Sequence, residues 1–221
     1  MRRELQRGIA YIEFSLSLMV LIPLLLGVAG IGLNMHQQLE TVQLARDAGH
    51  MFARNVDFTL TGNQQVLSSI AGSLGLTATG GIVGTAGSGS AVVILSTVRY
   101  VDTSACALAG KVDTHGVPSG CTNYTKWVFS ERIVIGNSTP WASSLGTPAS
   151  TIVTSNGTIL ILDQVTNASD VANITGFNPW SSTTSTGLPS GQWVFVAEAC
   201  AKGFRMPPFA GGASTYAQIY F

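Results

Sequence analysis

The sequence predicts an α+β protein, in which a long N-terminal helix, membrane-spanning in its first half and amphipathic in its second, precedes an antiparallel β-rich extracytoplasmic domain. Three observations predict this architecture. An apolar run at positions 9–33 contains a single charge, apolar residues at helical spacing continue to about residue 56, and runs of strand type follow residue 91. With 221 residues, the chain has the length of one domain with an appended segment.

The predicted organisation divides the chain into five consecutive segments. These are a cytoplasmic leader that is cleaved (1–8), a transmembrane helix (9–33), an amphipathic helix extension (34–58), a short helix with a Gly-rich linker (59–90), and the β-rich extracytoplasmic domain (91–221).

The composition excludes one class of partner. Charged residues make up 10% of the chain, against roughly 25% in an average soluble protein, and 11 basic residues balance 11 acidic ones. A chain without net charge has no long-range field that gathers nucleic acid. We therefore expect no nucleic-acid partner.

The apolar run at positions 9–33 is long enough to cross a membrane. At about 1.5 Å per residue, a helix of this length spans ~37 Å, whereas the hydrocarbon layer is ~30 Å thick. Arg2, Arg3 and Arg7 precede the run, while basic and acidic residues balance behind it. The positive-inside rule then places residues 1–8 in the cytoplasm and the chain after about residue 34 outside. We expect a single-pass protein of the cytoplasmic (inner) membrane, in contact with membrane lipid.

Two other N-terminal signals fit the same residues. A conventional secretory signal peptide has a basic start and a short apolar stretch before a small-x-small cleavage site, which Gly27-Val28-Ala29 supplies. Cleavage there releases a secreted outer domain. An uncleaved signal anchor instead holds an envelope enzyme or binding protein at the membrane.

Glu13 is the one charged residue of the apolar run. A carboxylate at the centre of a bilayer costs about 2.5–3.5 kcal/mol on insertion scales, and less near the interface, so acids in membrane helices are usually functional. The simpler alternative is that the Glu13 side chain reaches the interface and has no further role.

Residues 7–14 read Arg-Gly-Ile-Ala-Tyr-Ile-Glu-Phe. They resemble the processing motif of type IV pilins and their relatives, which has a glycine before the cut and a glutamate as the fifth residue of the mature chain. Within that superfamily they resemble the TadE-like subunits of Tad (tight adherence) pili, where an R-G-x-A-x-x-E-F start precedes a Leu-rich membrane helix. The resemblance covers residues 7–56 and, more loosely, the strand at 193–198 with Pro207-Pro208.

This resemblance implies a structural subunit of a Tad-type pilus or related apparatus, a minor pilin or pseudopilin, and no enzyme. It implies cleavage between Gly8 and Ile9 by a prepilin peptidase, with Glu13 and Phe14 in processing and assembly. The implied partners are that peptidase, other pilin or pseudopilin subunits and the inner-membrane assembly platform. In such assemblies the glutamate meets the new amino terminus of a neighbouring subunit, and the subunit can enter the pilus.

Two further features of the N-terminal helix follow from its residues. Pro23 removes the backbone donor that would bond the Met19 carbonyl, so we expect a kink or local loosening there. Beyond the membrane, apolar side chains at spacings of three and four predict an amphipathic face that packs on the outer domain or on another subunit. These are Met35, Leu39, Val42, Ala45, Ala48 and Phe52.

Gly-rich segments, turn signals and polar loops define the predicted elements of the outer domain. A short helix is expected at 64–74, and the Gly-rich segment 77–90 has no phosphate-binding pattern, so we interpret it as a loop. Asn156-Gly157 between two β-rich runs predicts a hairpin with a two-residue type I′ turn. Long polar loops are expected at 138–150 and 166–191. The predicted strands are 91–101, 126–135, 151–155, 158–165, 193–199 and 215–221.

Cysteines outside the cytoplasm usually pair. Cys106 and Cys121 flank a flexible Gly-rich connection, which favours a disulfide between them and leaves Cys200 free and buried. Pairing of Cys200 with either of the others remains an alternative, as does a metal site of the three cysteines with His115, although no C-x2-C spacing supports it.

No catalytic motif is recognised in the sequence. Two of the three histidines, His36 and His50, lie on the N-terminal helix, and neither a nucleophile elbow nor an HExxH pattern is present. We therefore expect no catalytic residues, no metal and no cofactor. A cluster of titratable residues with perturbed pKa values in a cleft would instead favour the enzyme or binding-protein alternative.

Overall fold

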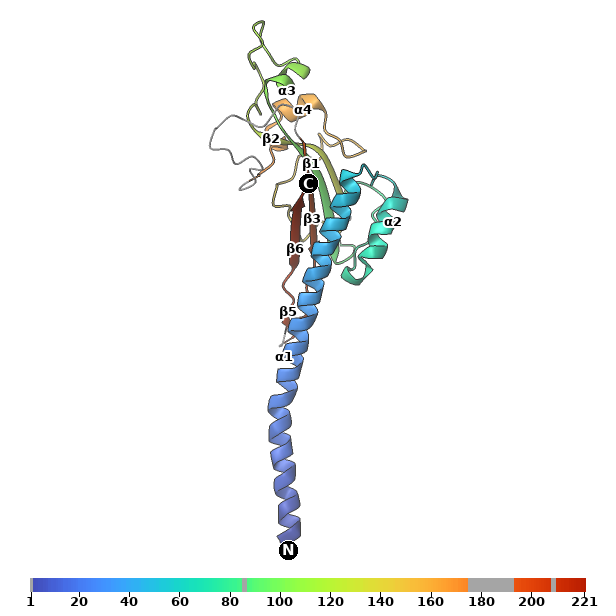
Figure 1. Ribbon diagram of the computed structural model, residues 1–221, viewed down its shortest axis with the longest axis vertical. Helices are drawn as coiled ribbons and strands as arrows, with labels where there is room; N and C mark the ends of the chain where they lie inside the picture. The colour runs from blue at the N-terminus through green and yellow to red at the C-terminus, as the bar shows by residue number, and fades with distance from the viewer. Residues whose placement is uncertain (1, 85–86, 175–192, 208–209) are drawn as a thin grey trace.

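Helix α1 (Arg2–Ala53) is continuous and projects far beyond the outer domain, which packs against only its C-terminal part (Figure 1). The structure is a computed structural model that describes residues 2–84, 87–174, 193–207 and 210–221. Asn55 ends the helix with a left-handed φ of 60°. The Asn55 amide donates to the Phe52 carbonyl and the Val56 amide to the Met51 carbonyl, which is the Schellman pattern of a helix C-terminus.

A four-stranded antiparallel sheet is the centre of the outer domain. Its strands are β1 (Ala91–Tyr100), β2 (Trp127–Gly136), β3 (Trp193–Ala201) and β6 (Thr215–Tyr220), in the order β2-β1-β3-β6. A β-bulge between Thr97 and Val98 shifts the register of β1 against β2. A small ribbon of β4 (Arg205–Met206) and β5 (Ala210–Gly211) connects β3 to β6.

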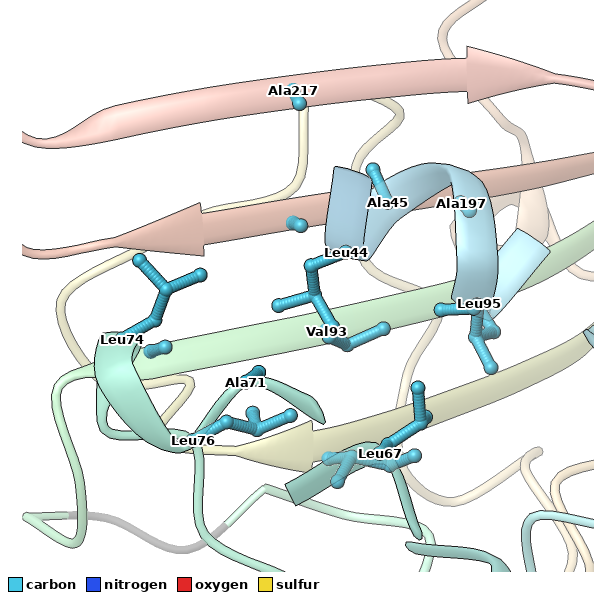
Figure 2. Close-up of a cluster of buried hydrophobic side chains, with 14 of the residues drawn as sticks. Leu44, Ala45, Leu67, Ala71, Leu74, Leu76, Val93, Leu95, Ala197 and Ala217 are labelled. Atoms are coloured by element: carbon cyan, nitrogen blue, oxygen red, sulfur yellow. The ribbon is translucent and has the colours of Figure 1, made fainter. Parts of the chain in front are cut away.

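The C-terminal part of α1 covers one face of the sheet over β3 and β6. Figure 2 shows Leu44 and Ala45 of the helix above Val93 of β1 and Ala197 of β3. Helix α2 (Thr61–Ile70) and the short 3₁₀ helix η1 (Gly72–Leu74) complete this core from the side. Long side chains from several elements and small ones on β3 together allow the helix to lie close to the sheet.

The other face of the sheet is covered by the irregular chain that follows β2. Phe129, Val194 and Val196 pack there against Leu145 and Ile159. The end of the sheet distal to the helix N-terminus carries α3 (Thr103–Leu108), α4 (Ile161–Thr166) and the 3₁₀ helix η2 (Ala168–Asp170). Both faces of the sheet are therefore covered, and strand β1 is buried along nearly its whole length.

The structure confirms the predicted α+β class, and only the later part of the predicted amphipathic face packs on the outer domain, while packing of its first part on another subunit stays a prediction. Met35 and Leu39 are 63% and 64% exposed, and the fully buried side chains of the described helix begin at Thr41. The helix also ends at Ala53, a few residues before the predicted limit. The buried positions are Thr41, Leu44, Ala45, Ala48 and Phe52.

Two of the predicted strands are also wrong. Residues 151–155 form turns with a single bridge from Val153 to Ile159, and much of 158–165 is helix α4. The chain turns after Ile159 because the Gln164 side-chain amide donates to the Ile159 carbonyl (2.6 Å) and closes the first turn of α4. The other four predicted strands correspond to β1, β2, β3 and β6.

The turn at Asn156-Gly157 exists, but it is not of type I′. Gly157 has a φ of 87°, whereas Asn156 is not left-handed, and the Gly157 amide donates to the Thr154 carbonyl (3.0 Å). This is a type I turn followed by a left-handed glycine. Asn156 keeps that conformation because its side-chain oxygen accepts from the Thr158 hydroxyl (2.8 Å). Of the predicted loop at 166–191, residues 175–191 lie outside the described residues.

Candidate assembly surface and processing motif

The N-terminal part of α1 is an apolar surface without partners in the described chain. It belongs to the one described helix that is long and apolar enough to cross a membrane, and its most apolar window has a mean hydropathy of 2.5 and is 6% buried. Such a surface is unfavourable in water, so it requires lipid or other helices around it. Its exposed large side chains are Tyr11, Ile12, Phe14, Leu16, Met19, Val20, Leu21, Ile22, Leu24, Leu25, Val28, Ile31 and Leu33.

The residues of the predicted processing motif lie in the first turns of this helix. Gly8 and Ile9 are both within α1, which passes through them without a break. The Glu13 side chain is exposed and forms no ion pair with any described residue, and Phe14 beside it is 62% exposed. The Ser17 hydroxyl donates to the Glu13 carbonyl (2.9 Å), so the first turns leave the carboxylate itself available to another chain.

Pro23 lies in the middle of the same exposed segment, and the helix continues through it. Its ring leaves the Met19 carbonyl without the usual amide donor, which is tolerated in membrane helices when neighbouring groups compensate. The kink at this position stays a prediction.

A shallow groove marks the point where α1 leaves the outer domain. It has a volume of about 350 Å³. Asn34 lies in it with its side-chain oxygen buried and without a hydrogen-bond donor, while its amide donates to the Gly30 carbonyl (3.0 Å). About two turns of α1 and the chain that enters β6 form the two walls. The lining residues are Ile31, Asn34, Met35, Gln38, Ala213, Ser214, Thr215 and Tyr216.

A buried acid on β3 is the clearest feature that the sequence analysis missed. Glu198 is fully buried on the sheet face opposite α1. Its carboxylate accepts from the Ser144 amide (2.9 Å), from the Tyr216 hydroxyl (2.7 Å) and from the hydroxyls of Ser143 and Ser144. A glutamate within the apolar run of β3 was the available signal, but its partners are 18 and 54–55 residues away in sequence.

Arg132 of β2 completes this network. Its guanidinium lies 3.8 Å from the Glu198 carboxylate and donates to the Ser96 hydroxyl (2.8 Å) and the Gly146 carbonyl (3.1 Å). Burial lowers the pKa of Arg132 to about 10, and the Glu198 carboxylate opposes this shift. Because every Glu198 oxygen already has donors and no exposed surface, the network attaches the 143–146 loop to the sheet rather than offering a base to a substrate.

The cysteines are divided between a disulfide and a buried thiol. Cys106 and Cys121 are joined, with 5.8 Å between their Cα atoms, which rules out the quartet of three cysteines and His115 as a metal site. Cys200 is free and buried, and burial followed by the Glu198 charge raises the pKa of its thiol to about 12, so it stays protonated. Within the described residues, no group of three or more His, Cys, Asp or Glu side chains is placed to hold a metal.

In the described part of the chain, the predicted site residues therefore lie at two separate locations. The motif around Glu13 lies towards the N-terminal end of α1, and the Cys106–Cys121 disulfide attaches to α3, which lies at the opposite end of the molecule from the N-terminus (Figure 1). His36 and His50 also stay apart, since His36 lies 3.4 Å from Glu40 and the His50 ring packs on Phe221.

Comparison with known proteins identifies the N-terminal segment. No curated protein and no solved structure matches the chain. The model of the TadE-like protein family matches residues 8–50, the segment that begins at the predicted cleavage motif and ends within the packed part of α1. This confirms the resemblance in the sequence: over residues 8–50, the chain is similar to the TadE-like protein family.

Proposed function

We propose that this protein is a pilin-like structural subunit of a Tad-type pilus, or of a related secretion or adhesion apparatus, assembled through its N-terminal helix. The observation that carries the proposal is the exposed apolar part of α1 with a single unpartnered acid near its start, within the segment that matches the TadE-like family. The helix supplies an anchor before assembly and a packing surface after it.

The proposed topology is a single pass through the inner membrane with the N-terminus in the cytoplasm. The arginines before the apolar run support it through the positive-inside rule. The Cys106–Cys121 disulfide also supports an outer domain beyond the cytoplasm, since disulfides persist in oxidising compartments. The leader of residues 1–8 then faces a prepilin peptidase at the membrane surface.

Cleavage after Gly8 gives Glu13 its role in this proposal. The cut creates an α-amino group on Ile9, with a reference pKa of roughly 7.7–8.0, so it is mostly cationic at neutral pH. Two unit charges about 4 Å apart gain roughly 4 kcal/mol at an effective dielectric constant near 20, before desolvation is subtracted. Glu13 of one subunit would pair with Ile9 of the next and set the register of their helices.

The mature N-terminus tests the processing step. We expect mass spectrometry of the protein isolated from its native envelope to find Ile9 as the first residue, and expect replacement of Gly8 by a bulky residue to block the cut. A mature chain that retains Met1 would show a plain anchor. A chain that begins near Gly30 would show a secreted domain, and either result would refute the proposal.

The role of Glu13 requires a separate experiment. We expect Glu13→Ala to insert into the membrane normally but to enter the assembly less efficiently, measured as the ratio of assembled to membrane-bound protein. Ser17→Ala is the matched control, because it changes a polar side chain one helical turn away and leaves the charge in place. Normal incorporation of Glu13→Ala would contradict the proposed pairing of Glu13 with the Ile9 amino group.

The alternative of an envelope enzyme or binding protein finds no support in the hydrogen-bond network around Glu198. This fully buried acid of the described outer domain is saturated by Ser143, Ser144, Tyr216 and Arg132. A catalytic carboxylate needs a free lone pair in reach of a substrate.

A further inference from the structure

Asp170 is an unusual residue at the distal end of the outer domain. It closes helix η2 and is fully buried, yet neither of its carboxylate oxygens has a hydrogen-bond donor. Buried carboxylates in proteins are normally paired or hydrogen-bonded, because an isolated charge loses its hydration without replacement. An unpartnered buried acid therefore points to something that is bound there.

Asn123 presents a second unpartnered oxygen at the same place. Its side-chain amide donates to the carbonyls of Gln164 (2.9 Å) and Asn167 (2.6 Å). Since carbonyls only accept, the orientation of this amide is determined, and its own oxygen must face the other way. That oxygen is buried and has no donor.

One carbonyl brings these two residues together. The Asn167 carbonyl accepts from the Asn123 side chain (2.6 Å) and also from the Asp170 backbone amide (3.1 Å). The two residues that carry the unpartnered oxygens, Asn123 and Asp170, are therefore held together by hydrogen bonds to one carbonyl group. The Asn123 backbone amide also donates to the Val165 carbonyl (3.0 Å), so both residues are attached to the C-terminal end of α4.

Asp163 adds a second negative charge. It lies in the first turn of α4, and its carbonyl accepts from the Asn167 amide (2.8 Å). Burial, and then the charge of Asp163, raise the pKa of Asp170 to about 8. No described Lys, Arg or His forms an ion pair with either aspartate. Asp163 thus carries a charge close enough to act on Asp170, and among the described residues no cationic side chain pairs with either acid.

We propose that Asp170, Asn123 and Asp163 form a binding site for a divalent cation, with Ca²⁺ as the ion that fits it. Ca²⁺ accepts carboxylate and amide oxygens in irregular geometry and completes its shell with backbone carbonyls and water, whereas Mg²⁺ requires a near-octahedral set. A single water molecule, with two hydrogens to donate, leaves at least one of the three unpartnered oxygens of Asp170 and Asn123 without a donor.

The bound ion would join two segments that are distant in sequence. Asn123 follows Cys121 of the disulfide by two residues, while Asp163 and Asp170 flank the end of α4. The cation would hold the disulfide loop against α4 and stabilise the distal end of the domain. This inference does not depend on the proposed pilin role, because it concerns only the outer domain.

The test is thermal unfolding of the full chain in detergent micelles, after EDTA treatment, with CaCl₂ added at constant ionic strength. We expect half-saturation at roughly 0.1–1 mM, in the range of extracellular Ca²⁺ modules, and a rise in the unfolding midpoint of roughly 3–8 °C at 10 mM. MgCl₂ at the same concentrations should give a smaller rise.

Asp170→Asn keeps the shape of the side chain and removes its charge, so it should abolish the Ca²⁺-dependent rise. Asp47→Asn, at an exposed position on α1, is the control and should retain it. Because Asp170→Asn can alter stability by itself, direct ⁴⁵Ca²⁺ binding is measured as well, with one ion per wild-type chain expected. Absence of saturable binding up to 10 mM, or equal binding by Asp170→Asn, would overturn the proposal.

Discussion

The two parts of helix α1 show how one regular element can serve two environments. Up to about residue 40 its large apolar side chains are exposed, whereas Leu44 is only 2% exposed and Ala45 and Ala48 are fully buried. The difference does not lie in hydrophobicity alone, because the exposed part is the more apolar of the two. The packed part has small residues that let its backbone approach β3 and β6, and it has polar residues on its outer side. The exposed part is apolar all round, as a membrane segment is.

Deletion of side-chain volume should separate the two parts most strongly. We expect Leu44→Ala to lower the free energy of unfolding of the outer domain by about 2–5 kcal/mol, because it leaves a cavity between α1 and the sheet. Leu39→Ala, five residues earlier and at a position that is 64% exposed, should change it by less than about 0.5 kcal/mol.

Both variants are measured by denaturant unfolding of the full chain in micelles, followed by the fluorescence of the tryptophans in the outer domain. Similar losses of unfolding free energy for Leu44→Ala and Leu39→Ala would show that the stability of the domain depends equally on both parts of the helix. Leu39→Ala is also expected to weaken assembly if its exposed side chain contacts another subunit, so the two readouts are recorded together.

Addition of a methyl group should have the next largest effect. A Cβ at Gly49 would lie 2.1 Å from a ring carbon of Phe221 and 3.0 Å from Cβ of Ala197. We expect Gly49→Ala to cost about 1–3 kcal/mol of domain stability, as overpacked cores do, with the loss limited by movement of the Phe221 ring. Gly32→Ala has nothing within 4 Å and should leave the domain unchanged. A neutral Gly49→Ala would mean that α1 lies farther from β3 than described.

The same contrast explains what the sequence could and could not predict. Periodicity identified the helix and its packed residues Ala45, Ala48 and Phe52, since these stand at helical spacing. It also included Met35 and Leu39, because spacing does not reveal where the outer domain begins to cover the helix. The position of that boundary depends on β6, which is the last strand of the chain.

Local chemistry accounts for the other errors. The run at 158–165 has strand-forming residues, but the Gln164 side chain closes a helical turn on Ile159, and such a contact has no signature in single-residue propensities. The network around Glu198 could be suspected from an acid in an apolar strand, but its partners come from a distant loop and strand. The motif that includes Gly8 and Glu13 could be recognised because its residues lie in one short stretch of the sequence.

The smallest expected effect concerns pH at the distal end of the packed part of α1. A cavity of about 260 Å³ lies there, and Phe52, Asp57 and Glu131 are among the residues that line it. Burial raises the pKa of Glu131, Asp57 raises it further, and a hydrogen bond from Thr97 (3.3 Å) opposes both. Because this acid binds its proton more tightly in the folded protein, its contribution to stability is full below the ordinary glutamate range and is lost as pH rises through the folded pKa.

Glu131→Gln removes that loss and keeps the side chain's shape. The variant should therefore gain stability relative to the wild type as pH rises from about 4.5 towards neutrality, by less than about 1 kcal/mol because Glu131 is partly exposed. The measurement is denaturant unfolding of both proteins from pH 4 to 7, at low salt and at 0.5 M salt. Burial is the largest cause of the shift, so the difference should persist at high salt, whereas a difference that disappears there would assign it to repulsion from Asp57. A wild type that becomes more stable than the variant as pH rises would mean that Glu131 has a cationic partner in solution, and that the packed end of α1 is held by charge as well as by apolar contact.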